Sequence, residues 1–354
     1  MWADFHWHAR DWAESHKETV KRSLELAYAS GGLAIGVMPN TTPPLTTLEF
    51  CQEYLKLADG VTVLGEKQKI LVQMYVHLAL TSDLEQVKRA IEATRKEPGI
   101  CGMKAYWGHS TGNLGILQEE IQSKVFSTLT QEGYEGVLVN HCEDDTLLSD
   151  TLYNSQEPKT WSTHCRPEKA EIASFIKTIS LAEQAGFQGK FHVAHVSTLQ
   201  VVDFINNYTG KLRISCGVTP HHFLLDNSYL ERPDGAWYKC NPPLRSKETQ
   251  QRLLERLMQG KIPIIESDHA PHTAKDKTQA IPASGIASGL VWPELRFYLR
   301  GLGMSREQIK AVTFDNAVAL YGLQDKIIYE ERKDRKELET VREKYPHQPF
   351  GEFF

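Results

Sequence analysis

The stretch Trp2-Ala3-Asp4-Phe5-His6-Trp7-His8-Ala9-Arg10 begins with an apolar run and ends with two histidines one residue apart. Residues two apart on a β-strand project to the same side of the strand, so His6 and His8 can face one metal ion. A single His-x-His pair is weak evidence, because any half-buried strand can carry one. The interpretation therefore depends on the polar residues at the ends of the other apolar runs.

Further short apolar runs recur along the chain, and segments with a helical period of 3.6 residues separate them. The pattern predicts strands over Trp2–His6, Leu33–Met38, Ile70–Leu78, Ile100–Tyr106, Gly136–His141, Phe191–Val196, Leu212–Gly217 and Pro263–Asp268. The clearest helix is expected over Pro167–Gly186, where one apolar stripe is formed by Ile172, Phe175, Ile176 and Ile179. Eight strands alternating with helices favour an α/β fold of the (β/α)8 TIM-barrel type, with functional groups at the C-terminal strand ends. A doubly wound open sheet is the alternative.

The length of 354 residues is sufficient for one large barrel, and we expect a single domain over residues 1–354. The segment Lys326–Lys344 is dense in Glu, Lys and Arg, which predicts a solvated, charged helical tail starting at about residue 324. Because the first candidate ligand is already residue 6 and the tail is not strand-like, we expect no accessory β-sandwich domain.

The composition excludes several classes of partner. A formal net charge of -5 gives no reason to expect nucleic acid or an anionic membrane surface, and no apolar run is long enough to span a bilayer. The N-terminus does not have the pattern of a signal peptide. Six scattered cysteines without a Cys-x-x-Cys spacing favour a reduced, cytoplasmic protein.

Polar side chains that suit metal binding or catalysis stand at the ends of the predicted strands. They are His6, His8, Asn40, Lys104, His141, His195 and Asp268. Each one alone is better explained as a structural residue, but so many at the same end of different strands indicate a shared site. Imidazole and carboxylate ligands without a thiolate suit zinc or a similar divalent ion in a catalytic site.

Several motifs, taken in order, resemble those of dihydroorotases, which are (β/α)8 metalloenzymes of the amidohydrolase superfamily. The matching segments are His6–Arg10, Met38–Thr41, Gly102–Tyr106, His192–Thr198, Val218–His222, Asn241–Arg245 and Asp268–His272. They extend over roughly residues 2–320, and the combination is much more specific than His-x-His alone.

The resemblance implies two divalent metal ions, expected to be zinc. The implied ligands are His6, His8 and Asp268 for one ion, His141 and His195 for the other, and Lys104 between them as an N-carboxylated lysine. A bare ammonium cannot bridge two cations, because it has no free lone pair. The carbamate formed with CO2 supplies two oxygen ligands.

The implied reaction is the reversible hydrolysis of dihydroorotate to N-carbamoyl-aspartate in pyrimidine biosynthesis, by a metal-bridging hydroxide and with Asp268 as general base and then acid. Arg10 suits the substrate carboxylate, since a guanidinium binds it in a bidentate fork. By resemblance Asn40 and His272 join Arg10, and Asn241 is expected to line the pocket. The small-molecule substrate is the expected partner, and homodimers are common in the family.

Two alternatives stay open. The segment Ala283–Leu290 departs from the loop that contacts the pyrimidine ring in relatives, so a hydantoinase- or allantoinase-like activity on another cyclic amide is the first rival. A non-catalytic, dihydroorotase-like assembly subunit is the second, and the complete ligand set argues against it. His192 is expected in the core or behind the ligands, and His221 and His222 have no ligand role that the sequence supports.

Overall fold

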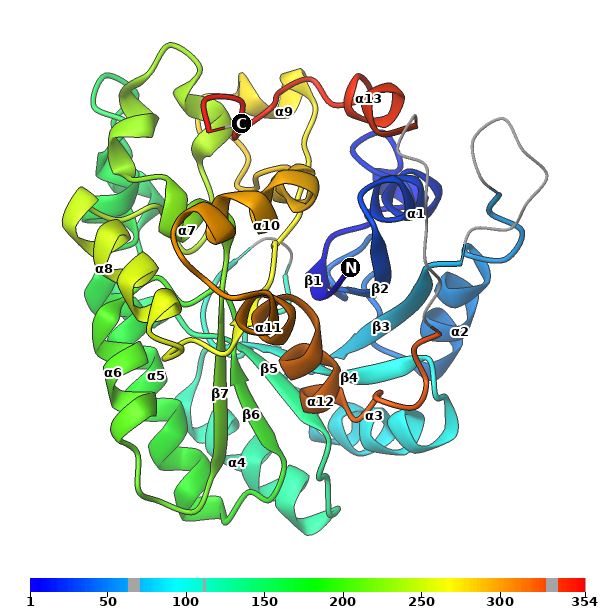
Figure 1. Cartoon of the computed structure of the whole chain (residues 1–354). Coiled ribbons are helices and arrows are strands. Elements are labelled where there is room, and N and C mark those ends of the chain that lie inside the picture. Colours follow the sequence, from blue (N-terminus) through cyan, green and yellow to red (C-terminus); the bar gives the residue numbers. More distant parts are fainter. Residues whose placement is uncertain (63–70, 111–112, 329–336, 354) are drawn as a thin grey trace.

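Eight parallel strands follow one another around a barrel in the computed structural model, which describes residues 1–62, 71–110, 113–328 and 337–353 (Figure 1). The strands are β1 (Trp2–Trp7), β2 (Gly32–Val37), β3 (Gln73–Ala79), β4 (Ile100–Tyr106), β5 (Val137–His141), β6 (Lys190–Val193), β7 (Arg213–Val218) and β8 (Ile264–Ile265). A parallel bridge between Trp7 and His269 brings the segment after β8 back to β1, and His8 N donates to His269 O at 2.8 Å. The barrel prediction is confirmed, and the open-sheet alternative is wrong.

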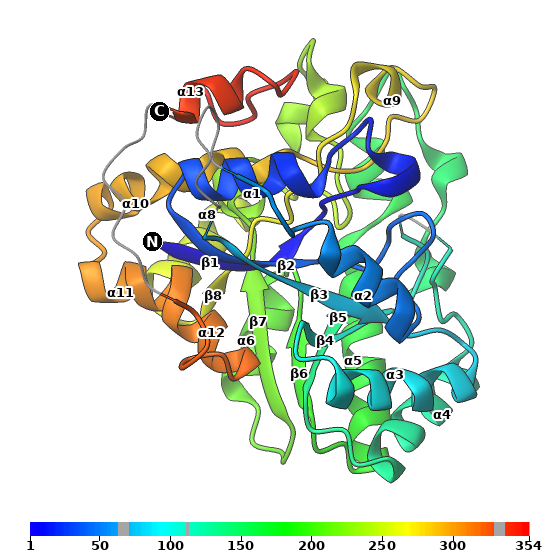
Figure 2. The ribbon, with the colours of Figure 1, turned by 90° about the vertical axis from the view of Figure 1, so that its right-hand side faces the viewer.

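The helices are α1 (Val20–Ala29), α2 (Leu48–Lys56), α3 (Leu84–Lys96), α4 (Glu119–Gln131), α5 (Glu168–Ala185), α6 (Leu199–Asn207), α7 (Pro220–Leu224), α8 (Lys247–Met258), α9 (Ala274–Lys277), α10 (Trp292–Gly301), α11 (Arg306–Lys310), α12 (Asn316–Tyr321) and α13 (Glu337–Arg342). Helices α2–α6 and α8 lie on the outside of the barrel (Figures 1 and 2). The main apolar core lies between these helices and the strands.

The predicted helix over Pro167–Gly186 is α5, with one error in its apolar stripe. Pro167 occupies the N-cap, and Gly186 ends the helix in the left-handed conformation at φ 68°. Phe175 and Ile179 are buried as expected, but the Ile176 side chain is 52% exposed. The buried face is therefore narrower than the i, i+3, i+4, i+7 stripe predicted.

Two predicted strands extend too far at their C-terminal ends. Strand β6 ends at Val193 and β8 at Ile265, whereas the pattern continued them to Val196 and Asp268. Both predicted ends include a residue of positive φ, since His195 has φ 39° and Asp268 has φ 48°. A residue in the left-handed region cannot continue a strand.

Helix α12 closes the end of the barrel that lies opposite the candidate site. The Tyr321 ring stacks on Phe5 of β1 at a centroid distance of 4.3 Å, and its hydroxyl lies 3.1 Å from His77 Nε2 of β3. Ala317 and Val318 join the same apolar cluster. The barrel interior is therefore packed on this side.

The expected solvated tail needs correction where the structure describes it. In the described part of the tail, helix α13 covers Glu337–Arg342 and lies beside α1, and Val341 and Tyr345 are buried (Figure 1). The Tyr345 hydroxyl donates to Glu18 at 2.8 Å. Residues 329–336 of the predicted helix lie outside the described residues. In the part of the chain that is described, no helix has the length and apolarity to cross a bilayer.

Candidate metal centre

His6, His8 and Asp268 meet where β1 adjoins the segment after β8. Asp268 Oδ1 lies 2.9 Å from His8 Nε2 and 3.4 Å from His6 Nε2, and all three side chains are buried. Burial lowers the pKa of His8 to about 4. Burial works against ionisation of Asp268, but the attraction of His6 and the hydrogen bond from His8 outweigh it and hold the Asp268 pKa below its usual value. Neutral imidazole and carboxylate are the forms that bind metals.

His141 and His195 form a second pair beside the first group. His141 Nδ1 lies 3.1 Å from His195 Nε2, and the His195 ring centroid is 5.0 Å from that of His6. Burial lowers the pKa of both imidazoles, so each offers a lone pair at neutral pH. The structure therefore brings all four predicted histidine ligands together with Asp268.

Lys104 of β4 lies in the same cleft and is only 1% exposed. Its amino group has no hydrogen-bond partner among the described residues and lies 5.2 Å from the centre of the Tyr106 ring. Burial lowers the Lys104 pKa to about 8, which favours the neutral amine. A neutral amine is the form that reacts with CO2, so the environment fits the predicted carbamate.

Glu266 holds several of these groups in place, although no sequence pattern had singled it out. It accepts a hydrogen bond from the backbone N–H of His195, and its Oε2 lies 3.5 Å from His6 Nδ1 and 3.3 Å from His192 Nε2. A carboxylate behind a ligating histidine fixes the ring and its tautomer. His192 lies behind the ligands, as expected. The available signal was the position of Glu266 two residues before Asp268.

A second buried carboxylate orients His141. Glu143 Oε2 lies 2.8 Å from His141 Nε2, and Glu143 also forms an ion pair with Arg166. Burial raises the cost of ionising Glu143, but Arg166 and His141 lower its pKa to about 2. The arrangement leaves His141 Nδ1 directed at His195.

The predicted substrate residues are close to the candidate ligands, with one exception. The cleft is lined by His6, His8, Arg10, Asn40, Lys104, Tyr106, Ser110, His141, His195, Asn241, Asp268, Ala270, Ser284 and Gly285. His272 lines the adjoining cavity instead, and its Nε2 is hydrogen-bonded to Ser284 O at 3.0 Å. Tyr106 and Ser110 were not among the predicted site residues, although Tyr106 is two residues from Lys104 on the same strand.

Arg10 is buried in this cleft, which does not fit a surface salt bridge. Its Nε and Nη1 have no hydrogen-bond partner among the described residues, and the Glu14 carboxylate is 3.7 Å from Nη1. A buried guanidinium with free donors is a suitable receptor for a carboxylate.

The segment that departs from the family pattern forms one wall of the cleft. Lys277 Nζ is buried and donates to Ala283 O at 2.8 Å and to Gly285 O at 2.7 Å. Ser284 Oγ donates to Asn241 Oδ1 at 3.2 Å. These contacts fix Ser284 and Gly285 at the edge of the cleft.

The donors fit a pair of divalent cations. Imidazoles and a carboxylate converge from several strands, and the Lys104 amine lies among them without a hydrogen bond to any described residue. The metal-ligand and substrate roles of the individual residues remain predictions.

Comparison with known proteins finds dihydroorotases among the relatives by sequence. No protein-family model matches the chain. The dihydroorotase of Lactobacillus acidophilus is 27% identical over 341 residues, which cover 94% of this chain and 75% of that protein. The dihydroorotase of Listeria monocytogenes is 29% identical over 303 residues, which cover 84% of this chain and 65% of that protein.

Solved structures share the barrel. The L-hydantoinase (dihydropyrimidinase) of Arthrobacter aurescens matches with a TM-score of 0.77 at 21% identity, covering 91% of this chain and 71% of its own. The dihydroorotase of Campylobacter jejuni matches with a TM-score of 0.67 at 20% identity, and the match covers 94% of this chain and 85% of that chain. At these identities the structural matches show the fold.

The sequence matches to dihydroorotases extend over nearly the whole barrel. The structural matches agree with them in fold. By sequence the chain is therefore similar to dihydroorotases over most of its length, and by fold it is similar to a hydantoinase and a dihydroorotase.

Proposed function

We propose that the chain is a metal-dependent cyclic amidohydrolase that interconverts dihydroorotate and N-carbamoyl-aspartate in pyrimidine biosynthesis. The observation that carries the proposal is the buried Arg10 guanidinium, which opens on the same cleft as the histidine and carboxylate cluster. An enzyme for dihydroorotate needs both a hydrolytic centre and a receptor for a carboxylate that does not react.

The predicted ligands would hold two divalent ions, zinc by donor type, with Lys104 as the N-carboxylated bridge. When bound, the ions supply a water of lowered pKa and polarise the scissile carbonyl. Asp268 takes a proton from the attacking water and delivers it to the departing ring nitrogen, which is general base and then acid catalysis. Arg10, with Asn40 and His272, holds the substrate carboxylate, and Asn241 contacts the ring.

A hydantoinase- or allantoinase-like activity is the alternative, since neither hydantoin nor allantoin carries a carboxylate. Such a substrate would leave Arg10 Nε and Nη1 buried beside the bound ligand without a hydrogen-bond acceptor, which is costly even with the Glu14 carboxylate 3.7 Å from Nη1. The geometry therefore favours the acidic substrate.

The test is turnover of purified, zinc-loaded protein on dihydroorotate, hydantoin and allantoin, with N-carbamoyl-aspartate for the reverse direction. We expect turnover of dihydroorotate and N-carbamoyl-aspartate to exceed that of the other two substrates. Turnover of hydantoin or allantoin without turnover of dihydroorotate or N-carbamoyl-aspartate would refute the assignment of dihydroorotate as the substrate. A metal-loaded chain inactive on all four would favour the assembly-subunit interpretation.

The proposal also includes a homodimer and a cytoplasmic location. Each of the six cysteines is a free thiol, which agrees with a reducing compartment. Light scattering of the protein as it elutes from a size-exclusion column would measure the oligomeric state.

A further inference from the structure

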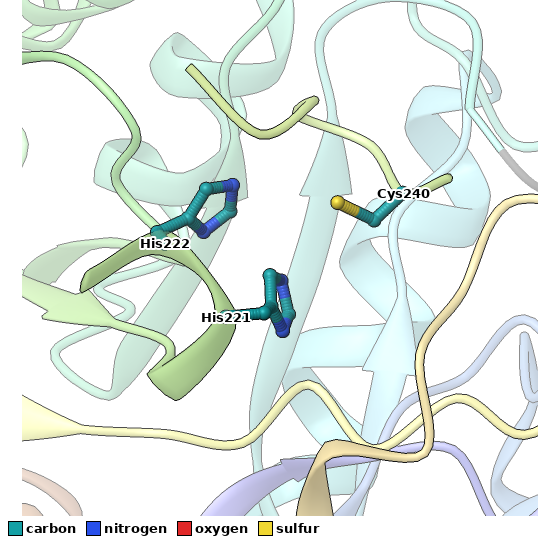
Figure 3. A group of neighbouring side chains, drawn as sticks. All are labelled: His221, His222 and Cys240. Carbon is teal, nitrogen blue, oxygen red and sulfur yellow. The ribbon is translucent and has the colours of Figure 1, made fainter. Parts of the chain in front are cut away.

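A second group of metal-binding side chains lies beside the candidate active site and shares no residue with it. His221 and His222 come from α7, which follows β7, and Cys240 comes from the loop before α8 (Figure 3). The three side chains point into one space, and one ligand atom from each lies within 4.8 Å of the others. All three are buried.

The hydrogen bonds of this cluster leave one potential metal-ligand atom without a partner and bring two others to the same carbonyl oxygen. His221 Nδ1 is bonded to Ser288 Oγ at 2.7 Å, but His221 Nε2 is buried and has no partner among the described residues. His222 Nε2 lies 3.1 Å from Pro242 O, and Cys240 Sγ lies 3.2 Å from the same oxygen. One carbonyl oxygen therefore faces both a ring nitrogen and a sulfur, while a third ligand atom nearby lacks a hydrogen bond.

We propose that His221, His222 and Cys240 bind one zinc ion, with the Pro242 carbonyl oxygen as fourth ligand. Thiolate and imidazole are the usual ligands of a closed, four-coordinate zinc site. The ion occupies the space that the His221 Nε2 lone pair faces, and it replaces the protons shared with Pro242 O.

The spacing suits tetrahedral coordination after a small adjustment. Zinc bonds of about 2.0–2.3 Å place neighbouring ligand atoms roughly 3.3–3.8 Å apart. The three side-chain donors, which lie within 4.8 Å of one another, need to approach by about 1–1.5 Å at most. The distances from Pro242 O to His222 Nε2 and to Cys240 Sγ are already slightly below the tetrahedral spacing.

The protonation states of the free cluster agree with this chemistry. Burial lowers the pKa of His222 to about 4, so its imidazole is neutral. Burial raises the pKa of Cys240 to about 12, so the side chain is a thiol until a cation displaces its proton. Zinc binding therefore releases one proton from Cys240.

The bound ion would join the end of β7 to the loop that carries Asn241. Asn241 lines the candidate active site, and its Oδ1 accepts hydrogen bonds from Trp161 Nε1 at 3.2 Å and from Ser284 Oγ at 3.2 Å. The site would hold this wall of the cleft in position without touching the substrate.

The sulfur ligand makes the experiment specific, because the predicted active-site ligands are all nitrogen and oxygen donors. Protein stripped with a chelator and reloaded with cobalt(II) should show an ultraviolet sulfur-to-cobalt charge-transfer band and bind three ions per chain. Cys240→Ser should abolish the band and bind one ion fewer. The matched control Cys51→Ala alters a buried thiol of α2 and should keep both the band and the third ion.

Zinc-loaded wild-type protein provides a measurement that does not depend on any variant folding. X-ray absorption should detect a zinc–sulfur distance of about 2.3 Å. Wild-type protein with no charge-transfer band and only nitrogen and oxygen scatterers around zinc would overturn the proposal and leave a hydrogen-bonded cluster. Dihydroorotate turnover, measured in parallel, reports on the proposed function independently of this site.

Discussion

At the scale of single residues, buried carboxylates decide which nitrogen of a histidine faces the candidate metals. Glu143 contacts His141 Nε2 and leaves Nδ1 for the cleft, whereas Glu266 lies beside His6 Nδ1 and leaves Nε2 directed at Asp268. The two histidines of one site thus present opposite ring nitrogens. The ligand geometry depends on these carboxylates as much as on the strands.

Asp268→Asn should abolish turnover while keeping the barrel. The amide cannot accept and return a proton, and this role is typically worth about 10²–10⁴-fold in rate. The measurement is kcat in both directions at equal metal content. Asp203→Asn, which removes only the ion pair with Arg256, is the control. A rate for Asp268→Asn within about threefold of the wild type would exclude Asp268 from proton transfer.

Arg10→Lys should raise KM for dihydroorotate much more than it lowers kcat. An ammonium cannot form the two-pronged contact, and a hydrogen bond to a charged group is worth about 1.5–3 kcal/mol, or roughly 10–150-fold in kcat/KM. Since the carboxylate does not react, the loss should appear in binding. Steady-state kinetics measure it, with Arg256→Lys, at a partly buried guanidinium paired with Asp203, as the control. An unchanged KM would contradict the role.

Lys104→Ala should remove one metal ion and lower activity by at least about a hundredfold, because the bridging ligand is lost. Added acetate or propionate should restore part of the activity by replacing the carbamate. Metal analysis and rates with and without the acid measure both effects. If the acids stimulate the wild type equally, the rescue does not report on Lys104.

At the scale of elements, the strand ends explain why much of the site was predictable. His8, Lys104 and His141 follow or end apolar runs, and parallel strands of a barrel bring such ends together. Glu266 and Glu143 were not predictable in the same way, since each stands beside a stronger candidate in the sequence. Their roles depend on which ring nitrogen they face, and only the folded geometry defines that.

Gly217→Ala should weaken metal binding from within β7. A Cβ at residue 217 would lie 2.6 Å from the carboxyl carbon of Glu266, which contacts His6, His192 and the His195 backbone. Displacing Glu266 should reduce metal affinity about 10–100-fold and stability by about 1–3 kcal/mol. Competition with a chromophoric chelator and urea unfolding measure these effects.

Gly301→Ala is the matched control, because no described atom lies within 4 Å of its added Cβ in α10. It should leave metal affinity unchanged and keep or slightly raise stability. Equal metal affinity of Gly217→Ala and Gly301→Ala would refute the positioning role of Glu266.

At the scale of the whole molecule, buried neutral histidines should make the metal-free protein sensitive to mild acid. Burial lowers the pKa of His77, inside the barrel, from 6.5 to about 3. Between these values the unfolded chain carries the extra proton, so the free energy of unfolding should fall as pH decreases, by about 1.4 kcal/mol per pH unit for this group.

Urea unfolding of chelator-treated protein between pH 7 and pH 4.5 tests this slope. His77→Asn should flatten the pH dependence, whereas substitution of the exposed His164 should not. If the free energy of unfolding depended on pH equally in the wild type and in His77→Asn, His77 would not be the source of the acid sensitivity.

The fold as a whole was predictable because eight apolar runs alternate with helical segments, which leaves few arrangements other than a barrel. The errors have local physical causes. His195 and Asp268, which were predicted to lie in strands, have positive φ, and the charged segment after Lys326 contains Val341 and Tyr345, which are buried. The average composition of a segment does not reveal single apolar side chains, such as these two, that pack against the barrel.

The stacking of Tyr321 on Phe5 ties the order of synthesis to the order of folding. Strand β1 is synthesised before the other strands of the barrel, yet the aromatic ring that covers its apolar face belongs to a helix made more than three hundred residues later. Until that helix emerges, the nascent chain lacks the ring that stacks on Phe5. The growing polypeptide should therefore recruit a holdase chaperone during translation, and truncation before α12 should leave the product dependent on it.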